Sequence, residues 1–187
     1  MRGFALAFAA ALGLIWAGQA QAIHLSESGS IAHLQGGFEA GDDKVFEEFL
    51  KRPRAQKISV LYLYSYGGQI GPAAKIAEMV RKAGIVTAVR ANNDVCDSAC
   101  TLVFAGGVRR HYVDGHHVVE GLSSRTGLGF HPARKIVNAA EGSHLSEGGS
   151  NRLLQVYARM GCPRAAELVL TGDTIDETGY RLPGILG

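Results

Sequence analysis

The run KISVLYLYSYGGQIGPAAKIAEMVRKAGIVTAV, residues 57–89, contains two different hydrophobic patterns. Lys57 to Tyr64 is rich in β-formers and almost continuously apolar, which is typical of a strand covered on both faces. From Ile70 to Val80 the apolar residues recur on one helical face, and Pro72 lies in the first turn of that helix. Ile85 to Val89 is again β-rich. The order strand, helix, strand predicts a parallel sheet with a right-handed crossover, and therefore an α/β fold.

Further elements are expected on both sides of this unit. Residues 23–33 predict one or two strands, and Asp42 and Asp43 open a helix that ends before Pro53. Farther along we expect a strand at 108–113, a short strand at 128–131, a loop over 139–149, a helix capped by Ser150 and a helix opened by Pro163. Because no repeat or long linker divides the chain, residues 23–187 are expected to form a single domain.

The first 22 residues have the parts of a secretory signal peptide. A basic start at Arg2 precedes an apolar run from Phe4 to Ala17 and an A-x-A site at Ala20–Ala22. The apolar run is shorter than the roughly 20 residues that span a membrane. We therefore expect cleavage after Ala22, a periplasmic or otherwise exported protein, and no membrane attachment after cleavage. An uncleaved anchor or a buried first helix is the alternative.

The composition gives no sign of a polyanionic partner or of a metal. The 19 Lys and Arg and 17 Asp and Glu leave a formal net charge of +2, to which Arg2 contributes. Without a basic run, we expect no binding to nucleic acid. No C-x-x-C pair occurs, and His111, His116 and His117 are interpreted as solvated turn histidines in preference to a surface metal site. Neither a metal nor a cofactor is expected.

A second stretch, residues 93–107, reads NDVCDSACTLVFAGG and changes character half-way. Its first half is polar and turn-like, whereas its second half is apolar on every side and therefore predicts a buried helix with Ser98 in the first turn. A hydroxyl in such a place needs a hydrogen-bond partner or a function. Cys96 and Cys100 flank Ser98, and they are either a disulfide that braces the loop or two small buried side chains. Cys162 is the third cysteine, so at least one thiol is left over or pairs with another molecule.

These patterns suggest nucleophilic chemistry at Ser98. A serine hydroxyl needs an adjacent base, and it needs N–H donors where an oxyanion forms. The N–H of Ala99 is one donor, because the first amides of a helix are unpaired. Gly68 is a second, because it follows a strand and, with Gly67, allows a sharp turn close to a substrate. His131 is the favoured base, since it ends a short strand between Phe130 and Pro132.

Three motifs in chain order resemble a known family. Residues 62–68 (YLYSYGG), 96–100 (CDSAC) and 129–132 (GFHP) are similar to the proteolytic subunit of the Clp protease and, more closely, to the exported ClpP-like proteins of bacteria. The resemblance covers roughly residues 31–134. It implies the ClpP/crotonase superfamily fold, in which stacked β-β-α units surround a mostly parallel sheet. It also implies Ser98 as the nucleophile, His131 as the general base, and Gly68 and Ala99 as oxyanion donors.

The chain departs from the family pattern at three points. Tyr66 stands where the family's glycine turn usually has proline, which loses rigidity but no donor. The interval between Ser98 and His131 is longer, and we place the extra residues in a loop at 115–127 that would cover the site or control entry. The family's acid lies late in the chain, which favours Asp173, with Asp176 as the runner-up. If neither fits, His131 is held by a backbone carbonyl or the protein is inactive.

The prediction is an exported ClpP-like serine hydrolase, a peptidase that cleaves an acyl bond of a peptide or protein substrate. The alternative is a non-catalytic binding or assembly protein of the same fold. Crotonase-like acyl-CoA chemistry is a third hypothesis, and it needs a catalytic carboxylate near the glycine turn. A homo-oligomer is compatible with the sequence, because the family forms dimers and rings.

Overall fold

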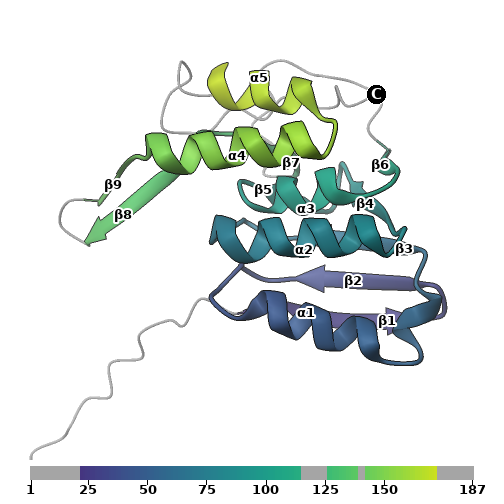
Figure 1. Cartoon of the computed structure of the whole chain (residues 1–187). Coiled ribbons are helices and arrows are strands. Elements are labelled where there is room, and N and C mark those ends of the chain that lie inside the picture. The colour runs from purple at the N-terminus through teal and green to yellow at the C-terminus, as the bar shows by residue number, and fades with distance from the viewer. Residues whose placement is uncertain (1–21, 115–125, 139–141, 172–187) are drawn as a thin grey trace, which may run out of the picture.

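A five-stranded sheet forms one layer of the molecule (Figure 1). The computed structural model describes residues 22–114, 126–138 and 142–171. The strand order is β1-β2-β3-β4-β6, and every neighbouring pair is parallel except β1 with β2. The strands are β1 (His24–Ser28), β2 (Ile31–Gln35), β3 (Val60–Tyr64), β4 (Val86–Arg90) and β6 (Arg110–Val113). The predicted α/β class with a mostly parallel sheet is confirmed.

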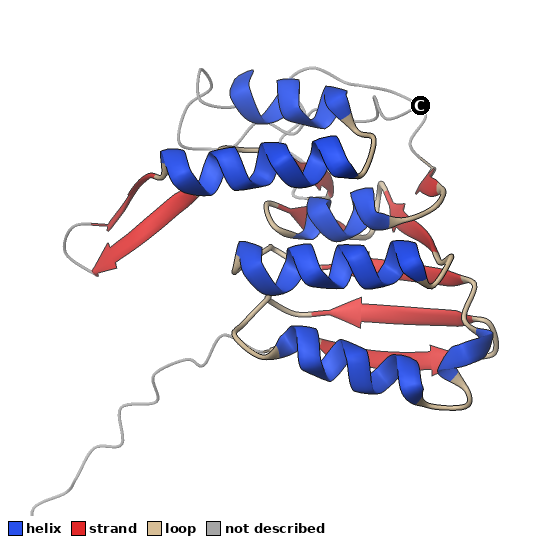
Figure 2. Ribbon diagram, viewed as in Figure 1, coloured by secondary structure: helices blue, strands red, loops and turns tan. Residues whose placement is uncertain are grey.

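The helices that connect the parallel strands lie on one side of the sheet (Figure 2). They are α1 (Asp42–Lys51), with the short helix η1 (Ala55–Lys57) after it, α2 (Ile70–Lys82) and α3 (Cys100–Gly106). Helices α4 (Glu147–Arg159) and α5 (Pro163–Thr171) follow in the same stack, so that the five helices lie one above another in Figure 1. The prediction that Asp42 opens a helix and that Pro163 opens another is confirmed.

Side-chain alternation along the strands explains how the helices attach. Leu61 and Leu63 in β3 are buried, whereas the intervening Tyr62 and the following Tyr64 are partly exposed. Small residues bring α2 and α3 into backbone contact, since a Cβ on Gly106 would lie 2.7 Å from the Cα of Ala77. A buried helix was expected here, and the close approach of α2 and α3 is the physical reason why its residues at the contact are small.

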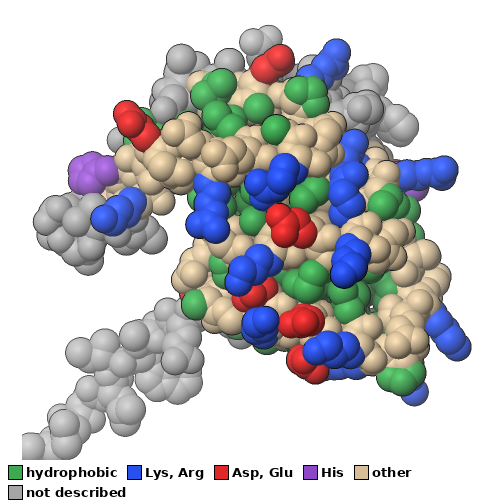
Figure 3. All heavy atoms as spheres, in the orientation of Figure 1, with side chains coloured by type: hydrophobic (Ala, Val, Ile, Leu, Met, Phe, Trp, Pro, Cys, Tyr) green, Lys and Arg blue, Asp and Glu red, His purple; other side chains and the backbone are tan. Residues whose placement is uncertain are grey.

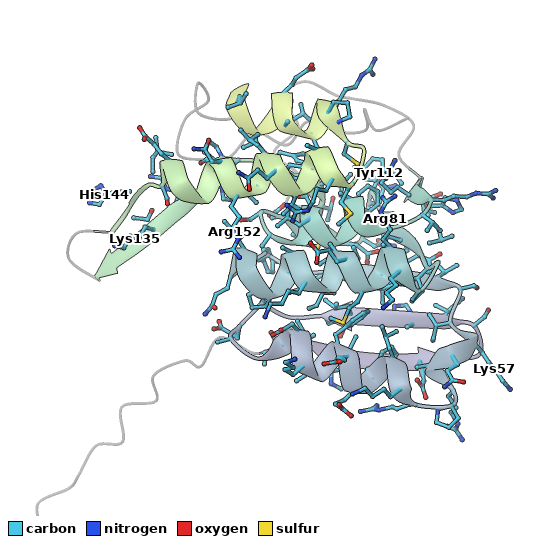
Figure 4. All side chains as sticks on the ribbon, viewed as in Figure 1. Lys57, Arg81, Tyr112, Lys135, His144 and Arg152 are labelled. Atoms are coloured by element: carbon cyan, nitrogen blue, oxygen red, sulfur yellow. A yellow bond between two sulfur atoms is a disulfide. The ribbon has the colours of Figure 1, made fainter. Side chains whose placement is uncertain are left out.

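Arg81 joins the ends of three elements. Its Nη2 donates to the carbonyl oxygens of Ala105 at 2.9 Å, Gly107 at 3.1 Å and Met160 at 3.1 Å. The side chain therefore satisfies carbonyls at the C-terminal ends of α3 and α4, which have no partner within their own helices. Figure 4 labels Arg81 on α2 at the end of the stack where these carbonyls lie.

Four short strands complete the described fold. β5 (Val95–Asp97) is parallel to β7 (Gly127–Gly129), and β8 (Arg134–Asn138) is antiparallel to β9 (Gly142–Leu145). The hairpin of β8 and β9 projects beyond α4 (Figure 1), and Lys135 and His144 lie on it (Figure 4).

Several sequence-based expectations in this region were wrong. Residues 142–145 form a strand where a loop was expected, because the sequence Gly-Ser-His-Leu has no apolar alternation to predict it. The cap of α4 is Ser146, whose Oγ accepts a hydrogen bond from the Gly149 N–H at 3.2 Å, and not Ser150. Likewise, Val95–Asp97 is a strand although it was interpreted as a turn.

The surface seen in Figure 3 carries both charge signs. Lys and Arg side chains alternate with Asp and Glu over the helices, so this face has no large patch of one sign. Three of the ion pairs lie within α1, where Lys44 pairs with Glu47 and Lys51 pairs with both Glu47 and Glu48. Among the residues that the structure describes, no helix has the length and apolarity required to cross a bilayer.

Candidate active site

Ser98 lies in a strained turn between a strand and a helix. It follows β5 and precedes α3, and its φ of 55° is in the left-handed region that non-glycine residues rarely adopt. Such a conformation costs on the order of 1–3 kcal/mol and is kept only where the surroundings impose it. The helix itself begins at Cys100, two residues later than expected. This is the geometry in which a sharp strand-to-helix turn presents a nucleophile, and the Ser98 side chain is partly exposed.

Backbone hydrogen bonds hold the Ser98 turn on both sides. The Ser98 N–H donates to the carbonyl oxygen of Gly129 at 2.9 Å, and the Ser98 carbonyl accepts from the Thr101 N–H at 3.0 Å. The Asp97 N–H donates to the carbonyl of Ser65 at 3.0 Å, which joins β5 to the end of β3. The turn is therefore attached to two segments distant in sequence.

A disulfide spans the same turn. Cys96 and Cys100 are bonded, with their Cα atoms 5.1 Å apart, and both side chains are fully buried. Of the two interpretations of this pair, the bridge is confirmed. Cys162 has a free buried thiol, and burial raises its pKa.

A buried chain of hydroxyl groups supports the Ser98 turn from α4. The Thr101 Oγ1–H donates to the carbonyl of Ser98, and it lies in a short hydrogen bond with the Tyr157 hydroxyl. Because Thr101 uses its own proton toward Ser98, Tyr157 is the donor in the second bond. Burial raises the pKa of Tyr157, so its hydroxyl keeps its proton. Sequence reasoning missed this support, because Tyr157 is 56 residues from Thr101 and lies in none of the motifs.

The predicted glycine turn lies directly against Ser98. Gly67 has a φ of 97° and Gly68 a φ of 132°. A Cβ on Gly67 would lie 2.6 Å from the Ser98 Cβ and 3.1 Å from the Ala99 nitrogen. The turn therefore needs glycine for its conformation and for its contact with the serine.

Two partners outside the motif fix the glycine turn. The Gly67 N–H donates to Ser65 Oγ at 3.0 Å, and the Gly67 carbonyl accepts from the Phe38 N–H at 2.9 Å. A Cβ on Gly68 would lie 2.6 Å from the Phe38 nitrogen, so Phe38 also closes the space behind this residue. No sequence signal pointed to Phe38, which belongs to a loop some thirty residues upstream.

Two amide groups beside Ser98 are unused by the protein. Within residues 22–114, 126–138 and 142–171, neither the Gly68 N–H nor the Ala99 N–H donates a hydrogen bond. The Ala99 nitrogen lies within 3.1 Å of the position of a Cβ on Gly67, and Gly68 is the residue that follows Gly67. These are the groups that were predicted as oxyanion donors.

His131 follows the strand to which the Ser98 turn is bonded. Gly129 accepts from the Ser98 N–H and is paired with Asp97, and His131 is two residues farther along. The side chain is half-buried, and its Nδ1 lies 2.7 Å from the carbonyl oxygen of Pro132. A carbonyl can only accept, so Nδ1 carries the proton and, in the neutral ring, Nε2 keeps its lone pair. The predicted acids, Asp173 and Asp176, lie outside the described residues, as do residues 115–125 of the loop predicted at 115–127, whose last residue, Gly127, opens β7.

A cavity of about 370 Å³ opens beside the residue that follows His131. Apolar side chains from β9, α4 and α5 form most of its wall, and three polar side chains from α4 form the rest. Its lining residues are Pro132, Leu145, Glu147, Ser150, Asn151, Leu154, Val169 and Leu170. A cavity of this size and composition suits a small apolar ligand group with a few polar contacts.

No protein-family model and no curated protein matches the sequence. Among solved structures, the chain is similar to a serine-to-alanine variant of 1510-N, a membrane-bound stomatin-specific protease, with a TM-score of 0.55. The alignment covers 74% of this chain and 68% of that chain at 11% identity. The chain has the ClpP/crotonase fold. The fold implied by the three motifs is thus confirmed.

Acyl-CoA enzymes are also among the similar structures. One is methylmalonyl CoA decarboxylase complexed with 2S-carboxypropyl CoA, with a TM-score of 0.43 and 13% identity over 81% of this chain and 61% of that chain. Another is an enoyl-CoA hydratase from Shewanella pealeana, with a TM-score of 0.33 and 12% identity over 48% and 46%. Likeness at this level concerns the fold and leaves the activity to the site residues.

Proposed function

We propose that this chain is an exported serine hydrolase that cleaves peptide bonds. The observation that carries the proposal is the left-handed Ser98 turn, packed against Gly67 and hydrogen-bonded to Gly129. A strained serine between a strand and a helix, beside unused backbone amides, is costly for stability alone and useful for nucleophilic attack. The similar protease structure, which is a serine-to-alanine variant, favours the same chemistry.

In the proposed reaction, Ser98 Oγ attacks the carbonyl carbon of the scissile bond. His131 Nε2 takes the serine proton and then gives it to the leaving amine. The N–H groups of Gly68 and Ala99 donate to the negatively charged oxygen of the tetrahedral intermediate. Water then repeats the sequence on the acyl-enzyme, with His131 again as the base, and releases the acid product.

The orientation of His131 is part of the proposal. The hydrogen bond from Nδ1–H to the Pro132 carbonyl selects the tautomer that a general base needs. A backbone carbonyl is the predicted alternative to an acid as the partner of His131, and it orients the ring without adding a negative charge. Asp173, with Asp176 as the runner-up, is the other proposed acceptor for this proton, and a triad would require the carboxylate to replace the Pro132 carbonyl at Nδ1.

We propose that the cavity next to Pro132 receives an apolar side chain of the substrate. Its wall is mostly apolar, and it lies one residue from the proposed base. Burial of one leucine-sized side chain would contribute about 1.5–3 kcal/mol to binding. Peptides with a leucine or phenylalanine next to the scissile bond are therefore the first substrates to try.

A fluorophosphonate probe tests the nucleophile. Labelling is expected for the mature chain and is expected to disappear with Ser98→Ala, while Ser26→Ala, which changes an exposed serine in β1, leaves it unchanged. His131→Ala is expected to slow labelling by about 10²–10⁴-fold, the usual contribution of a positioned base. Undiminished labelling in the Ser98 variant would overturn the assignment. An absence of labelling in the mature chain would favour the non-catalytic binding or assembly protein.

Export is proposed from the first 22 residues. The full chain with a C-terminal tag is expected in the periplasmic fraction of a Gram-negative host. Its intact mass should correspond to a chain that begins at Ile23. Retention in the cytoplasm at full-length mass would contradict export without bearing on the Ser98 chemistry.

A further inference from the structure

The backbone nitrogen of Ile23 lies at a buried carboxylate. It donates to Asp42 Oδ2 at 3.4 Å, across 19 residues of sequence. The same oxygen accepts from the Glu39 N–H at 2.7 Å. The Ile23 side chain is only 7% exposed, so packing in the core fixes the position of its nitrogen.

Asp42 is buried without a cationic side chain. It is 2% exposed at the first residue of α1, and the ion pairs found among the described residues do not include it. The nearby Lys75 bonds Asp43 instead, at 2.7 Å. A buried carboxylate is expensive unless it is hydrogen-bonded and paired with opposite charge. The helix N-terminus supplies only part of that charge.

The expected signal-peptide cleavage site is the bond immediately before Ile23. Ala22 is exposed, so the chain leaves the core at this point. Hydrolysis of the Ala22–Ile23 bond adds water across the peptide, which leaves a carboxylate on Ala22 and an amine on Ile23. An α-amino group has a pKa of about 7.7–8.0 and is mostly protonated at neutral pH.

We infer that the α-ammonium group of mature Ile23 forms a buried ion pair with Asp42. The inference rests on the proposed export and cleavage after Ala22. Cleavage turns a neutral N–H donor into a charged group with three donors at a position that the packing of Ile23 already fixes. The precursor lacks this pair, so processing stabilises the attachment of the chain start and β1 to the first turn of α1.

The test compares chains that differ at their first residue. One chain starts at Ile23 and the other at Ala22, each released from a fusion by a protease that leaves no extra residue. The two chains have the same net charge, but the α-ammonium group of the chain that starts at Ala22 lies one residue farther from Asp42. The chain that starts at Ile23 is expected to have a Tm higher by roughly 4 °C or more.

Two variants assign the difference to Asp42. In Asp42→Asn the two chain starts are expected to have the same Tm, whereas in Asp43→Asn, which changes the neighbouring carboxylate, the full difference should persist. Equal Tm values in the unsubstituted pair, or a difference that survives Asp42→Asn, would overturn the inference. The intact mass of the exported protein tests the cleavage position separately, and the Tm comparison does not depend on hydrolase activity.

Discussion

The disulfide across the Ser98 turn predicts a measurable loss of stability when it is removed. We consider the double variant Cys96→Ala/Cys100→Ala. The two cysteines have a sequence separation of 4, and closing so short a loop in the unfolded chain is worth about 2 kcal/mol in the chain-entropy model. For a chain of this size, that loss lowers the Tm by roughly 4–8 °C.

Cys162 provides the matched control. Its thiol is free and buried, so Cys162→Ala reports the cost of losing one buried sulfur without a cross-link. Urea unfolding gives the loss of unfolding free energy for each variant. The loss in the double variant should exceed twice the loss in the Cys162 variant by about 2 kcal/mol. A double variant within about 0.5 kcal/mol of that doubled value would refute the cross-link as a restraint on the unfolded chain.

The same variant bears on the proposed site. The left-handed backbone at Ser98 costs on the order of 1–3 kcal/mol, and the bridge is one of the restraints that impose it. Without the bridge, a fraction of the molecules should leave the left-handed backbone conformation at Ser98. Fluorophosphonate labelling of Ser98 should therefore slow. Labelling at the original rate would show that the hydrogen bonds of the turn hold the serine without the disulfide.

Four further predictions concern single contacts, three of them around the site and one at the helix ends. Gly67→Ala is expected to abolish labelling and to lower the free energy of unfolding by roughly 1–3 kcal/mol, whereas Gly71→Ala, in an open position of α2, should do neither. Thr101→Val leaves the Tyr157 hydroxyl buried without its acceptor, which should lower the free energy of unfolding in urea by about 1–3 kcal/mol. In a chain that already carries Tyr157→Phe, the same substitution should cost nothing further. Because burial raises the pKa of Tyr157, stability should be lost as the pH rises above about 10, the value in the unfolded chain, and this loss should be shallower in Tyr157→Phe. Arg81→Met should cost about 1.5–3 kcal/mol, since the Met160 carbonyl loses its charged donor while Arg110 still donates to the carbonyls of Ala105 and Gly107, and an unchanged urea midpoint would contradict that role.

Local sequence patterns were sufficient for the strand–helix–strand unit and for the serine turn. Residues 57–89 combine an apolar, β-rich run with a helical face, and these patterns gave the element types correctly. The expectation that β3 is covered on both faces was wrong, because Tyr62 and Tyr64 lie on its partly exposed face. Ser98 was conspicuous because a hydroxyl stood at the start of an apolar segment. The glycine turn was recognisable because Gly67 and Gly68 end a strand.

Interactions between distant segments were not predictable. Phe38 and Tyr157 fix the site by contacts across about 30 and 56 residues, and neither lies in a motif. The β8–β9 hairpin was missed because neither strand alternates apolar and polar residues along its sequence. A cap at Ser150 was a natural choice from its position before an apolar periodicity, yet Ser146 caps α4, and Ser150 Oγ accepts from the Ala133 N–H at 3.1 Å.

The tight contact between Gly106 and Ala77 has a mechanical consequence. Where two helices touch backbone to backbone, no flexible side chain lies between them to absorb a displacement. At this contact helices α2 and α3 are therefore expected to move as one unit, and Ser98 lies two residues before the opposite end of α3.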